Sequence, residues 1–353
     1  MKLLGALLGS LGLAAATLST TSTTSNSPSS PTTSTSSSPL VFTVVGDWGG
    51  LPTYPYTTPR QISVAERLGV WAARVNSQFT LALGDNFYFT GVHNGADARF
   101  QETFENVFTA ESLMKPWYVI AGNHDHYGNV TGEVDYSRYS DRWNFPSLYY
   151  TFTKTTPGGE TVRFVMLDTI VLCGQTADDA PAEEQPRHMD PLEGKKLADD
   201  QLQWLETTLA AAQEDWVIVT GHYPVYSIAE HGPTSYMVEN VKPLLEKYNV
   251  AAYLNGHDHS MQHLNDGSVV DYFVLGAANF AESSQKHEHD VPTNSSKYMW
   301  PTSTDSQGAF GQVTLDDGTM RVDIVESTGS VLYSYTKANP RAQAQKKHGI
   351  TQK

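Results

Sequence analysis

Cysteine is nearly absent from this chain of 353 residues, which contains only Cys173. An intramolecular disulfide is therefore excluded, and the fold must depend on a hydrophobic core, which a chain of this length can form. Basic residues are also scarce, because 23 Lys and Arg stand against 38 Asp and Glu, for a formal charge of -15. This balance excludes binding of nucleic acid or an anionic membrane through a broadly basic surface.

Long hydrophobic runs are missing after the N-terminal segment. In that segment, Lys2 precedes the apolar stretch LLGALLGSLGLAAATL, which is short for a membrane span and contains the small residues Ala14-Ala15-Ala16. We interpret residues 1–18 as a secretory signal peptide, with an uncleaved anchor as the alternative. The mature protein is then expected outside the membrane, either secreted or in an acidic compartment of the lysosome or vacuole type.

The composition divides the remaining chain into three parts. Residues 19–39 are almost all Ser, Thr and Pro, so we expect a disordered linker, either an O-glycosylated stalk or an unmodified one. Residues 40–336 form one predicted domain, expected to be monomeric, and residues 337–353 form a predicted loose basic tail. Asn129 and Asn294 begin glycosylation sequons, which gain weight from the predicted signal peptide.

In much of the domain, predicted helices alternate with predicted strands. Val64, Leu68, Trp71 and Val75, for example, recur at helical spacing. This alternation favours buried, mostly parallel central strands. The predicted helices are Arg60–Asn76, Arg99–Phe108, Leu197–Ala212 and Val241–Tyr248, and the strands that follow them are Phe79–Leu83, Trp117–Ala121, Trp216–Thr220 and Ala251–Leu254.

Other segments indicate antiparallel strands joined by short turns. They include a hairpin across the turn Pro157-Gly158-Gly159. A simple doubly wound sheet does not accommodate so many antiparallel strands. We therefore predict an α/β (α+β) fold in which two sheets pack face to face and are flanked by helices. The strands are Leu148–Thr153, Val162–Leu167, Asp271–Leu275, Gly308–Leu315, Met320–Val325 and Val331–Tyr335.

Five segments share one pattern, an apolar run that ends in Gly and then in a metal-type ligand. They are Val44–Gly49, Leu81–Tyr88, Val119–His126, Val217–Pro224 and Ala252–His259. Buried strands side by side would deliver these polar residues to one rim, which is how proteins hold two cations close together. The alternative is that they are ordinary polar residues at strand ends. The candidate ligands are Asp47, Asp85, Tyr88, Asn123, His222, His257 and His259.

The charges of these side chains suggest two different ions. Asp47, Asp85 and a deprotonated Tyr88, joined by a histidine, offer hard anionic oxygens that suit a trivalent cation such as iron(III). Asn123, His222 and the other histidine of the His257/His259 pair are neutral. With Asp85 as a bridge, this second group suits a divalent cation, and iron(II), zinc and manganese all fit.

Such a pair of cations, about 3.5–4 Å apart, polarises phosphoryl oxygens and makes a hydroxide nucleophile from bound water. We expect this hydroxide to persist at acid pH. His124, next to Asn123, is a candidate general acid for the leaving group, with Asp125 as the residue that orients it. The loop carrying Glu230 and His231 is a second candidate source of an acid. The alternatives are a structural histidine at 124 and a solvated loop at 230–231.

Together the motifs resemble those of the purple acid phosphatases, within the calcineurin-like metallophosphoesterase superfamily. The resemblance is strongest to the small, tartrate-resistant type and extends from Leu40 to Tyr335. Each motif alone is weak, but the set in this order is specific. The motifs are GDWG at Gly46, GDNFY at Gly84, GNHDHYGN at Gly122, GHYPVYSIAEHGPT at Gly221 and GHDH at Gly256.

The resemblance implies a four-layer sandwich of two mixed sheets flanked by helices, and a secreted acid phosphatase that hydrolyses phosphate monoesters. We expect a broad substrate range, with phosphoproteins, nucleotides and sugar phosphates as the candidates. The resemblance implies Fe(III) held by Asp47, Asp85, Tyr88 and His259, which would colour the protein purple or pink. It implies a divalent metal held by Asp85, Asn123, His222 and His257. The substrate-side residues would be His124, Glu230 and His231.

This chain also departs from the mammalian enzymes, which carry a disulfide that one cysteine cannot form. Residues 174–195 resemble the loop that restrains the mammalian enzymes until it is cut. Three competing functions remain open from sequence. They are a phosphodiesterase of the same superfamily, a metal- or phosphate-binding module with weak turnover, and redox chemistry at a di-iron site.

Overall fold

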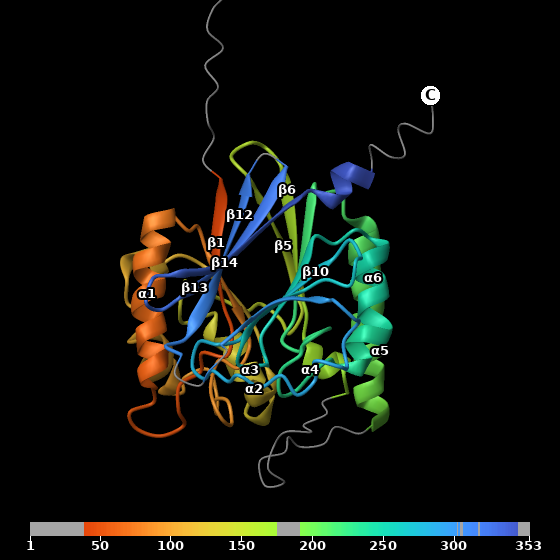
Figure 1. The fold of residues 1–353 in the computed structure, drawn as a ribbon. Helices are drawn as coiled ribbons and strands as arrows, with labels where there is room; N and C mark the ends of the chain where they lie inside the picture. Colours follow the sequence, from red (N-terminus) through yellow and green to blue (C-terminus); the bar gives the residue numbers. More distant parts are fainter. Residues whose placement is uncertain (1–38, 175–190, 302, 304–305, 317, 345–353) are drawn as a thin grey trace, which may run out of the picture. The chain divides into compact units, whose positions relative to one another are not determined.

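The computed structural model describes residues 39–174, 191–301, 303, 306–316 and 318–344, all within one compact unit (Figure 1). The predicted signal peptide, nearly all of the predicted linker and most of the 174–195 loop lie outside these residues. Within the described residues, no helix is long and apolar enough to cross a bilayer.

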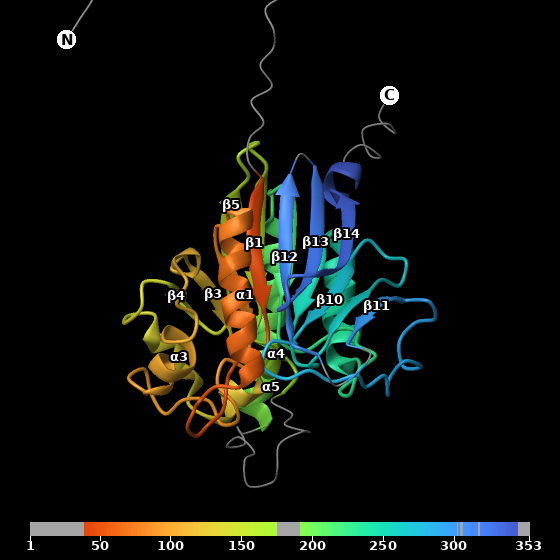
Figure 2. The same cartoon turned by 60° about the vertical axis from the view of Figure 1, so that its left-hand side comes forward.

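The first sheet has seven strands in the order β14-β13-β12-β1-β2-β3-β4. One half is parallel and contains β1 (Leu40–Val45), β2 (Thr80–Leu83), β3 (Trp117–Ile120) and β4 (Trp143–Asn144). The other half is antiparallel and follows β1 through β12 (Ala309–Asp316), β13 (Thr319–Glu326) and β14 (Val331–Ala338). Figure 2 shows β1 beside this antiparallel half.

The second sheet also has seven strands, in the order β11-β9-β10-β8-β7-β6-β5. Its parallel part contains β6 (Thr161–Met166), β7 (Trp216–Thr220), β8 (Ala252–Asn255) and β10 (Asp271–Leu275). The antiparallel strands β5 (Tyr150–Thr155), β9 (Met261–Leu264) and β11 (Ser296–Trp300) complete it. Both sheets are therefore mixed, as predicted.

Aromatic and aliphatic side chains join the two sheets face to face. Phe42 of the first sheet stacks on Phe79 with ring centroids 4.8 Å apart. It also meets Phe164 of the second sheet edge-on at 5.3 Å. All three rings are buried, and each contributes about 2 kcal/mol by leaving water. The inner faces of both sheets thus form one core.

Helices cover the outer faces, with α1 on one side of the sheets in Figure 1 and α5 and α6 on the other. Helix α1 (Pro59–Val75) begins where Thr58 accepts a hydrogen bond from Gln61 N, and it buries Val64, Leu68 and Trp71. Helices α5 (Pro191–Ala211) and α6 (Lys242–Lys247) pack on the second sheet through Leu205, Leu209 and Leu245. The fold is thus the predicted sandwich flanked by helices.

Several predicted bounds were wrong. Within the segment predicted as a helix at 99–108, the structure has a short π-helix at Phe100–Glu105. The helix predicted at Val241 begins earlier, as the π-helix Met237–Val241 that continues into α6. Strands β4, β9 and β11 were not predicted.

The C-terminal boundary also differs from the prediction. Strand β14 continues to Ala338, and residues 340–344 are helical. The Arg341 guanidinium donates to the carbonyls of Tyr248 and Ala212 at 3.0 and 2.6 Å. The folded part therefore continues beyond residue 336 to at least residue 344, and only residues 345–353 of the predicted tail lie outside the described residues.

Candidate metal centre

The parallel strands of both sheets end at the same edge, near the short helices α2 (Asn123–Tyr127) and α4 (Thr169–Leu172) in Figure 1. All seven candidate ligands follow one of these strands. Asp47 follows β1, Asp85 and Tyr88 follow β2, and Asn123 follows β3, while His222 follows β7, and His257 and His259 follow β8. The carboxyl ends of parallel strands are the usual place for a site in such sheets.

Tight turns at the strand ends aim the ligands inward. Asp47, Asp85 and His257 all adopt positive φ, at 56°, 51° and 72°. Asp and His tolerate this left-handed region better than bulky residues do. The neighbouring glycines are needed for space, since a Cβ on Gly122 would lie 2.1 Å from Asp85 Oδ1 and one on Gly256 2.3 Å from Asp47 Oδ2.

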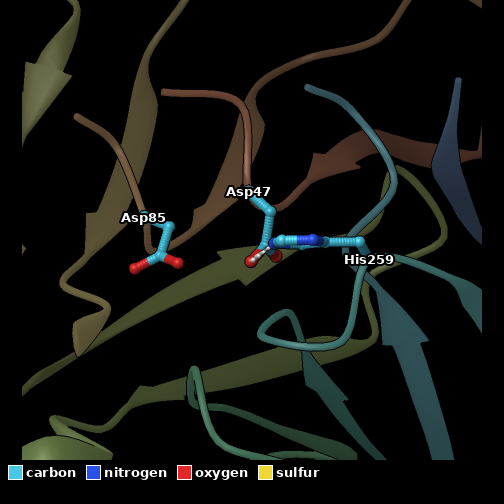
Figure 3. Close-up of side chains that lie close together, drawn as sticks. All are labelled: Asp47, Asp85 and His259. Atoms are coloured by element: carbon cyan, nitrogen blue, oxygen red, sulfur yellow. Dashed lines mark ion pairs between the residues drawn. The ribbon is translucent and has the colours of Figure 1, made fainter. Parts of the chain in front are cut away.

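The first group of ligands surrounds Asp47. Asp47, Asp85 and His259 each offer one ligand atom, and these atoms lie within 4.8 Å of one another (Figure 3). The Tyr88 hydroxyl lies 3.2 Å from Asp47 Oδ1 and 3.0 Å from His259 Nε2. Tyr88 therefore belongs with Asp47 and His259.

The second group surrounds His222. Its Nδ1 lies 2.9 Å from the Leu83 carbonyl, which can only accept, so Nδ1 carries the proton and Nε2 has a free lone pair. That Nε2 lies 3.0 Å from Asn123 Oδ1 and 3.4 Å from Asp85 Oδ1. The His257 ring is 5.1 Å from the His222 ring, centroid to centroid. The structure thus places His257 with His222, and His259 with Tyr88.

Burial and neighbouring like charges make it costly in free energy to ionise the acidic side chains of this centre when no cation is bound. Burial, and then the Asp85 carboxylate, raise the pKa of Asp47 well above its usual range. Burial opposes ionisation of Asp85 as well, but nearby His222 and His124 outweigh it and lower its pKa. Burial lowers the pKa of His259 to about 3, which leaves the ring neutral and able to bind a metal.

Tyr88 shows the same cost. Burial, followed by Asp47 and Asp85, raises the pKa of its hydroxyl well above the usual value. A bound cation reverses such costs, because it stabilises carboxylates and a phenolate together. Buried carboxylate and phenol oxygens beside neutral nitrogens and an amide oxygen form a donor set that fits two metal ions.

His124 lies beside Asp85 and Tyr88, with its ring centroid 4.7 Å from that of Tyr88. Its backbone N–H donates to Asp85 Oδ1 at 3.1 Å, and its ring Nδ1 lies 2.7 Å from the Phe89 carbonyl. The sequence suggested that Asp125 orients this ring, but in the structure the Asp125 carboxylate has other partners. This carboxylate accepts hydrogen bonds from the backbone N–H groups of Asn86, Phe87 and Gly122, so it holds two ligand turns together.

The side chains of His231 and Glu230 have different surroundings in the structure. The His231 ring stacks on the His257 ring with centroids 4.2 Å apart, so it borders the second group. The Glu230 carboxylate instead lies near the protein surface, 2.9 Å from Lys286 Nζ and 2.8 Å from Ser284 Oγ. The ion pair and hydrogen bonds recorded for Glu230 thus go to residues outside the ligand set.

Two residues that sequence reasoning missed also shape the centre. The Asn279 backbone N–H donates to the Asp47 carbonyl at 2.8 Å, and its side chain bridges Thr58 and Gly50. Asn279 follows β10, so the same strand-end pattern could have found it. Asp258 forms a second cluster with His231 and Glu282, whose ligand-type atoms lie within 4.8 Å of one another. No separate sequence signal marks Asp258, because it lies inside the GHDH motif between two candidate ligands.

The comparisons with known proteins show the family of this chain. The calcineurin-like phosphoesterase family matches residues 40–261. Human tartrate-resistant acid phosphatase type 5 is 47% identical over 297 residues, which cover 83% of this chain and 89% of the human protein. The rat protein of the same name is 46% identical over 84% of this chain and 90% of its own length. Purple acid phosphatase 17 of Arabidopsis thaliana is 30% identical over 68% of each chain.

Solved structures show the same fold at lower identity. GAP50, described as the anchor in the inner membrane complex of Plasmodium, superposes with a TM-score of 0.70 at 22% identity, covering 86% of this chain and 89% of its own. Purple acid phosphatase PPD1 from yellow lupin gives 0.58 at 17% identity, covering 86% of this chain and 54% of its own. From the family match and the identities to the curated relatives, this chain belongs to the calcineurin-like phosphoesterases and, within them, to the tartrate-resistant purple acid phosphatases.

Proposed function

We propose that this protein is a secreted acid phosphatase that hydrolyses phosphate monoesters at a dinuclear Fe(III)–M(II) centre. The observation that carries the proposal is the position of the Tyr88 hydroxyl, within 3.2 Å of both Asp47 and His259, in a group that shares Asp85 with Asn123 and His222. Phosphoryl transfer by a protein depends mainly on charge stabilisation and positioning, which such a centre provides.

The two groups differ in the ions that they suit. Asp47, Asp85, Tyr88 and His259 offer three oxygens that can be anionic, which favours Fe(III). Asn123, His222 and His257 add neutral donors to Asp85, which favours a divalent ion such as Fe(II), zinc or manganese. When bound, the two cations would polarise the phosphoryl oxygens and make a nucleophile from water.

The chain's own residues then handle the leaving group and the phosphate. Because Nδ1 of His124 donates to the Phe89 carbonyl, its Nε2 is the nitrogen able to give a proton to the leaving-group oxygen. His231, stacked on His257, borders the same centre and is positioned to meet a phosphate oxygen. Glu230 supports this edge through Lys286 and Ser284, so we assign it no contact with the reacting atoms.

The proposed location rests on residues 1–18 as a signal peptide and on two exposed sequon asparagines, Asn129 and Asn294. Small phosphomonoesters and phosphoproteins are the proposed substrates, and the mature protein is proposed to be a monomer. N-terminal sequencing of protein recovered from culture medium tests the secretion step. A start that retains residues 1–18 would contradict it.

The activity is tested with purified, metal-loaded protein on p-nitrophenyl phosphate and on bis(p-nitrophenyl) phosphate, together with a visible spectrum. We expect preferred hydrolysis of the monoester and a visible band from tyrosinate bound to iron. Asp85→Ala should lower kcat/KM by at least about a thousandfold, equal to roughly 4 kcal/mol of transition-state stabilisation, because both ions lose a ligand.

Asp141→Ala is the matched control, because this carboxylate is exposed and lies outside the ligand set. It should keep both the activity and the colour. A colourless, inactive protein after metal loading would overturn the proposal, as would faster hydrolysis of the bis-ester or full activity in the Asp85→Ala variant.

A further inference from the structure

Three buried polar side chains near the centre have no place in the ligand set. They are Asp258, Gln262 and Ser227, and all three are fully buried. Burying polar groups costs free energy unless hydrogen bonds compensate for it. Asp258 is notable because it lies between the ligands His257 and His259, yet its carboxylate contacts a different segment. That segment is Ser227–Gly232, called here the His231 segment.

Asp258 and Gln262 hold the His231 segment at several points. Asp258 Oδ1 accepts a hydrogen bond from the His231 backbone N–H at 2.9 Å, and Oδ2 accepts one from Ser227 Oγ. Gln262, on β9, donates from Nε2 to Ser227 Oγ at 2.7 Å and accepts from the Ile228 backbone N–H at 3.0 Å. These hydrogen bonds hold the His231 segment in place.

These hydrogen bonds fix the backbone from which the His231 ring projects. Hydrogen bonds to Asp258 or Gln262 hold the segment at Ser227, Ile228 and His231. The chain then turns away at Gly232, whose φ is +73°. The ring itself stacks on His257 with an interplanar angle of 26°. A group held in place before the substrate arrives loses less entropy when it acts than a mobile one does.

We propose that Asp258 and Gln262 are positioning residues, which hold the His231 segment so that the His231 ring meets the substrate phosphate. The inference rests on the proposed phosphatase function and deepens it. It predicts that Asp258 acts through His231 rather than through the metals. Asn cannot replace Asp258, because the Asp258 carboxylate accepts a hydrogen bond at each of its two oxygens. The NH2 group of an amide would face either the His231 N–H, which only donates, or the Ser227 hydroxyl. That hydroxyl already accepts from Gln262 Nε2 and the Ala229 N–H.

A double-mutant cycle tests this. The variants are Asp258→Asn, His231→Ala and the two together, each metal-loaded and assayed with phenyl phosphate. Inorganic phosphate affinity is measured by titration calorimetry, and bound metal by elemental analysis. We expect Asp258→Asn to lower kcat/KM by about tenfold or more, as the loss of residues that orient a site does, with both metals retained. In the His231→Ala background the same change should cost less than about twofold.

Phosphate affinity gives a readout that does not depend on turnover, and it should weaken in step with kcat/KM. Ser227→Ala is a second variant, which keeps the test possible if Asp258→Asn fails to fold. It removes the hydroxyl that bonds to both Asp258 and Gln262, and its effect should depend on His231 in the same way. Asp271→Asn is the matched control, since Asp271 is an equally buried carboxylate on β10 that contacts His263 instead. It should leave phosphate affinity unchanged.

Equal losses in both backgrounds, or loss of metal in Asp258→Asn and Ser227→Ala, would overturn the inference. No effect of either change on phosphate affinity would overturn it as well. If the loaded wild-type protein does not hydrolyse phenyl phosphate at all, the proposed function fails, and that outcome differs from an active enzyme whose cycle is additive.

Discussion

His124 and His222 each have one ring nitrogen fixed by a backbone carbonyl, and this decides what the other nitrogen does. The carbonyl of Leu83 fixes His222 Nδ1, which leaves Nε2 beside Asn123 and Asp85. The carbonyl of Phe89 fixes His124 Nδ1, and its half-buried ring borders the centre. The same arrangement therefore gives one histidine a free lone pair for a metal and the other a nitrogen free to carry a proton.

The proposed proton transfer by His124 predicts a dependence on the leaving group. His124→Ala should lower kcat by about a hundredfold on an alkyl phosphate, which is typical of a lost general acid. The loss should be much smaller on p-nitrophenyl phosphate, because p-nitrophenolate departs without a proton. Steady-state rates on both esters measure this. An equal loss on the two esters would show that His124 serves the fold or the metals instead.

At this scale the sequence identified ligand types but not the directions of side chains. His257 and His259 alternate with Asp258, and their chemistry suited metals. Whether Asp258 faced the metals or the His231 segment depended on a turn that sequence spacing does not define. Asp125 was likewise assigned to His124, but it binds three backbone N–H groups of the ligand turns.

At the scale of elements, apolar runs predicted the strands β1, β2, β3, β7 and β8, because nearly all of their side chains are buried on both faces. Strand β9 could not be predicted from its sequence, because two of its four buried residues, Gln262 and His263, are polar. Gln262 is satisfied by Ile228, and His263 by Asp271 and Tyr333. Such long-range partners compensate for the burial but leave no local pattern.

The ion pair between α2 and α4 gives a prediction that depends on pH. His126 Nε2 lies 2.9 Å from Asp168 Oδ2, and both side chains are buried. Burial opposes the charge on His126, but Asp168 outweighs it and raises the pKa of His126 above its usual value. Stability from this pair is therefore complete below the unfolded-state pKa of about 6.5, and it is lost as the pH rises through the folded-state value.

Asp168→Asn separates the charge of Asp168 from its capping role, because Asn can still accept from Ile170 N and Val171 N. We expect it to destabilise the protein by roughly 3 kcal/mol at pH 5.5, where the His126 cation would be left buried and unpaired, and by less at pH 9. Urea unfolding at the two pH values measures the difference. The same loss at both values would mean that the protonation state of His126 does not change between them, which would contradict the prediction.

At the scale of the whole molecule, the two sheets depend on each other. The first sheet delivers Asp47, Asp85 and Asn123, and the second delivers His222 and His257, so the centre exists only when both are assembled. The sequence indicated two sheets because antiparallel strands exceeded what one doubly wound sheet accommodates. It did not indicate that β1 pairs with β12, since such a distant register depends on the packing of the entire core.

Lys337, near the C-terminus, links the two sheets through its ammonium group. It belongs to β14 of the first sheet, yet its Nζ lies 2.7 Å from Asp271 Oδ2 on β10 of the second sheet and donates to the Ala251 and Val269 carbonyls. Burial opposes the charge on Asp271, but the hydrogen bond from His263 and the charge of Lys337 together outweigh it and lower the pKa of this carboxyl. Loss of Lys337 would therefore leave a buried carboxylate with less compensation.

A chain ending at residue 336 should consequently be less stable by at least about 3 kcal/mol than one ending at residue 344, a large part of the stability of an ordinary domain. Urea unfolding of the two truncated chains measures this difference. Lys337→Met in the full-length chain separates the ion pair from the other contacts of residues 337–344, among them those of Arg341. It should reproduce most of the loss, because the stem still packs while the charge is gone. Equal urea midpoints for the two truncated chains would show that the folded domain ends at residue 336, and that the contact between β14 and the second sheet adds nothing to its stability.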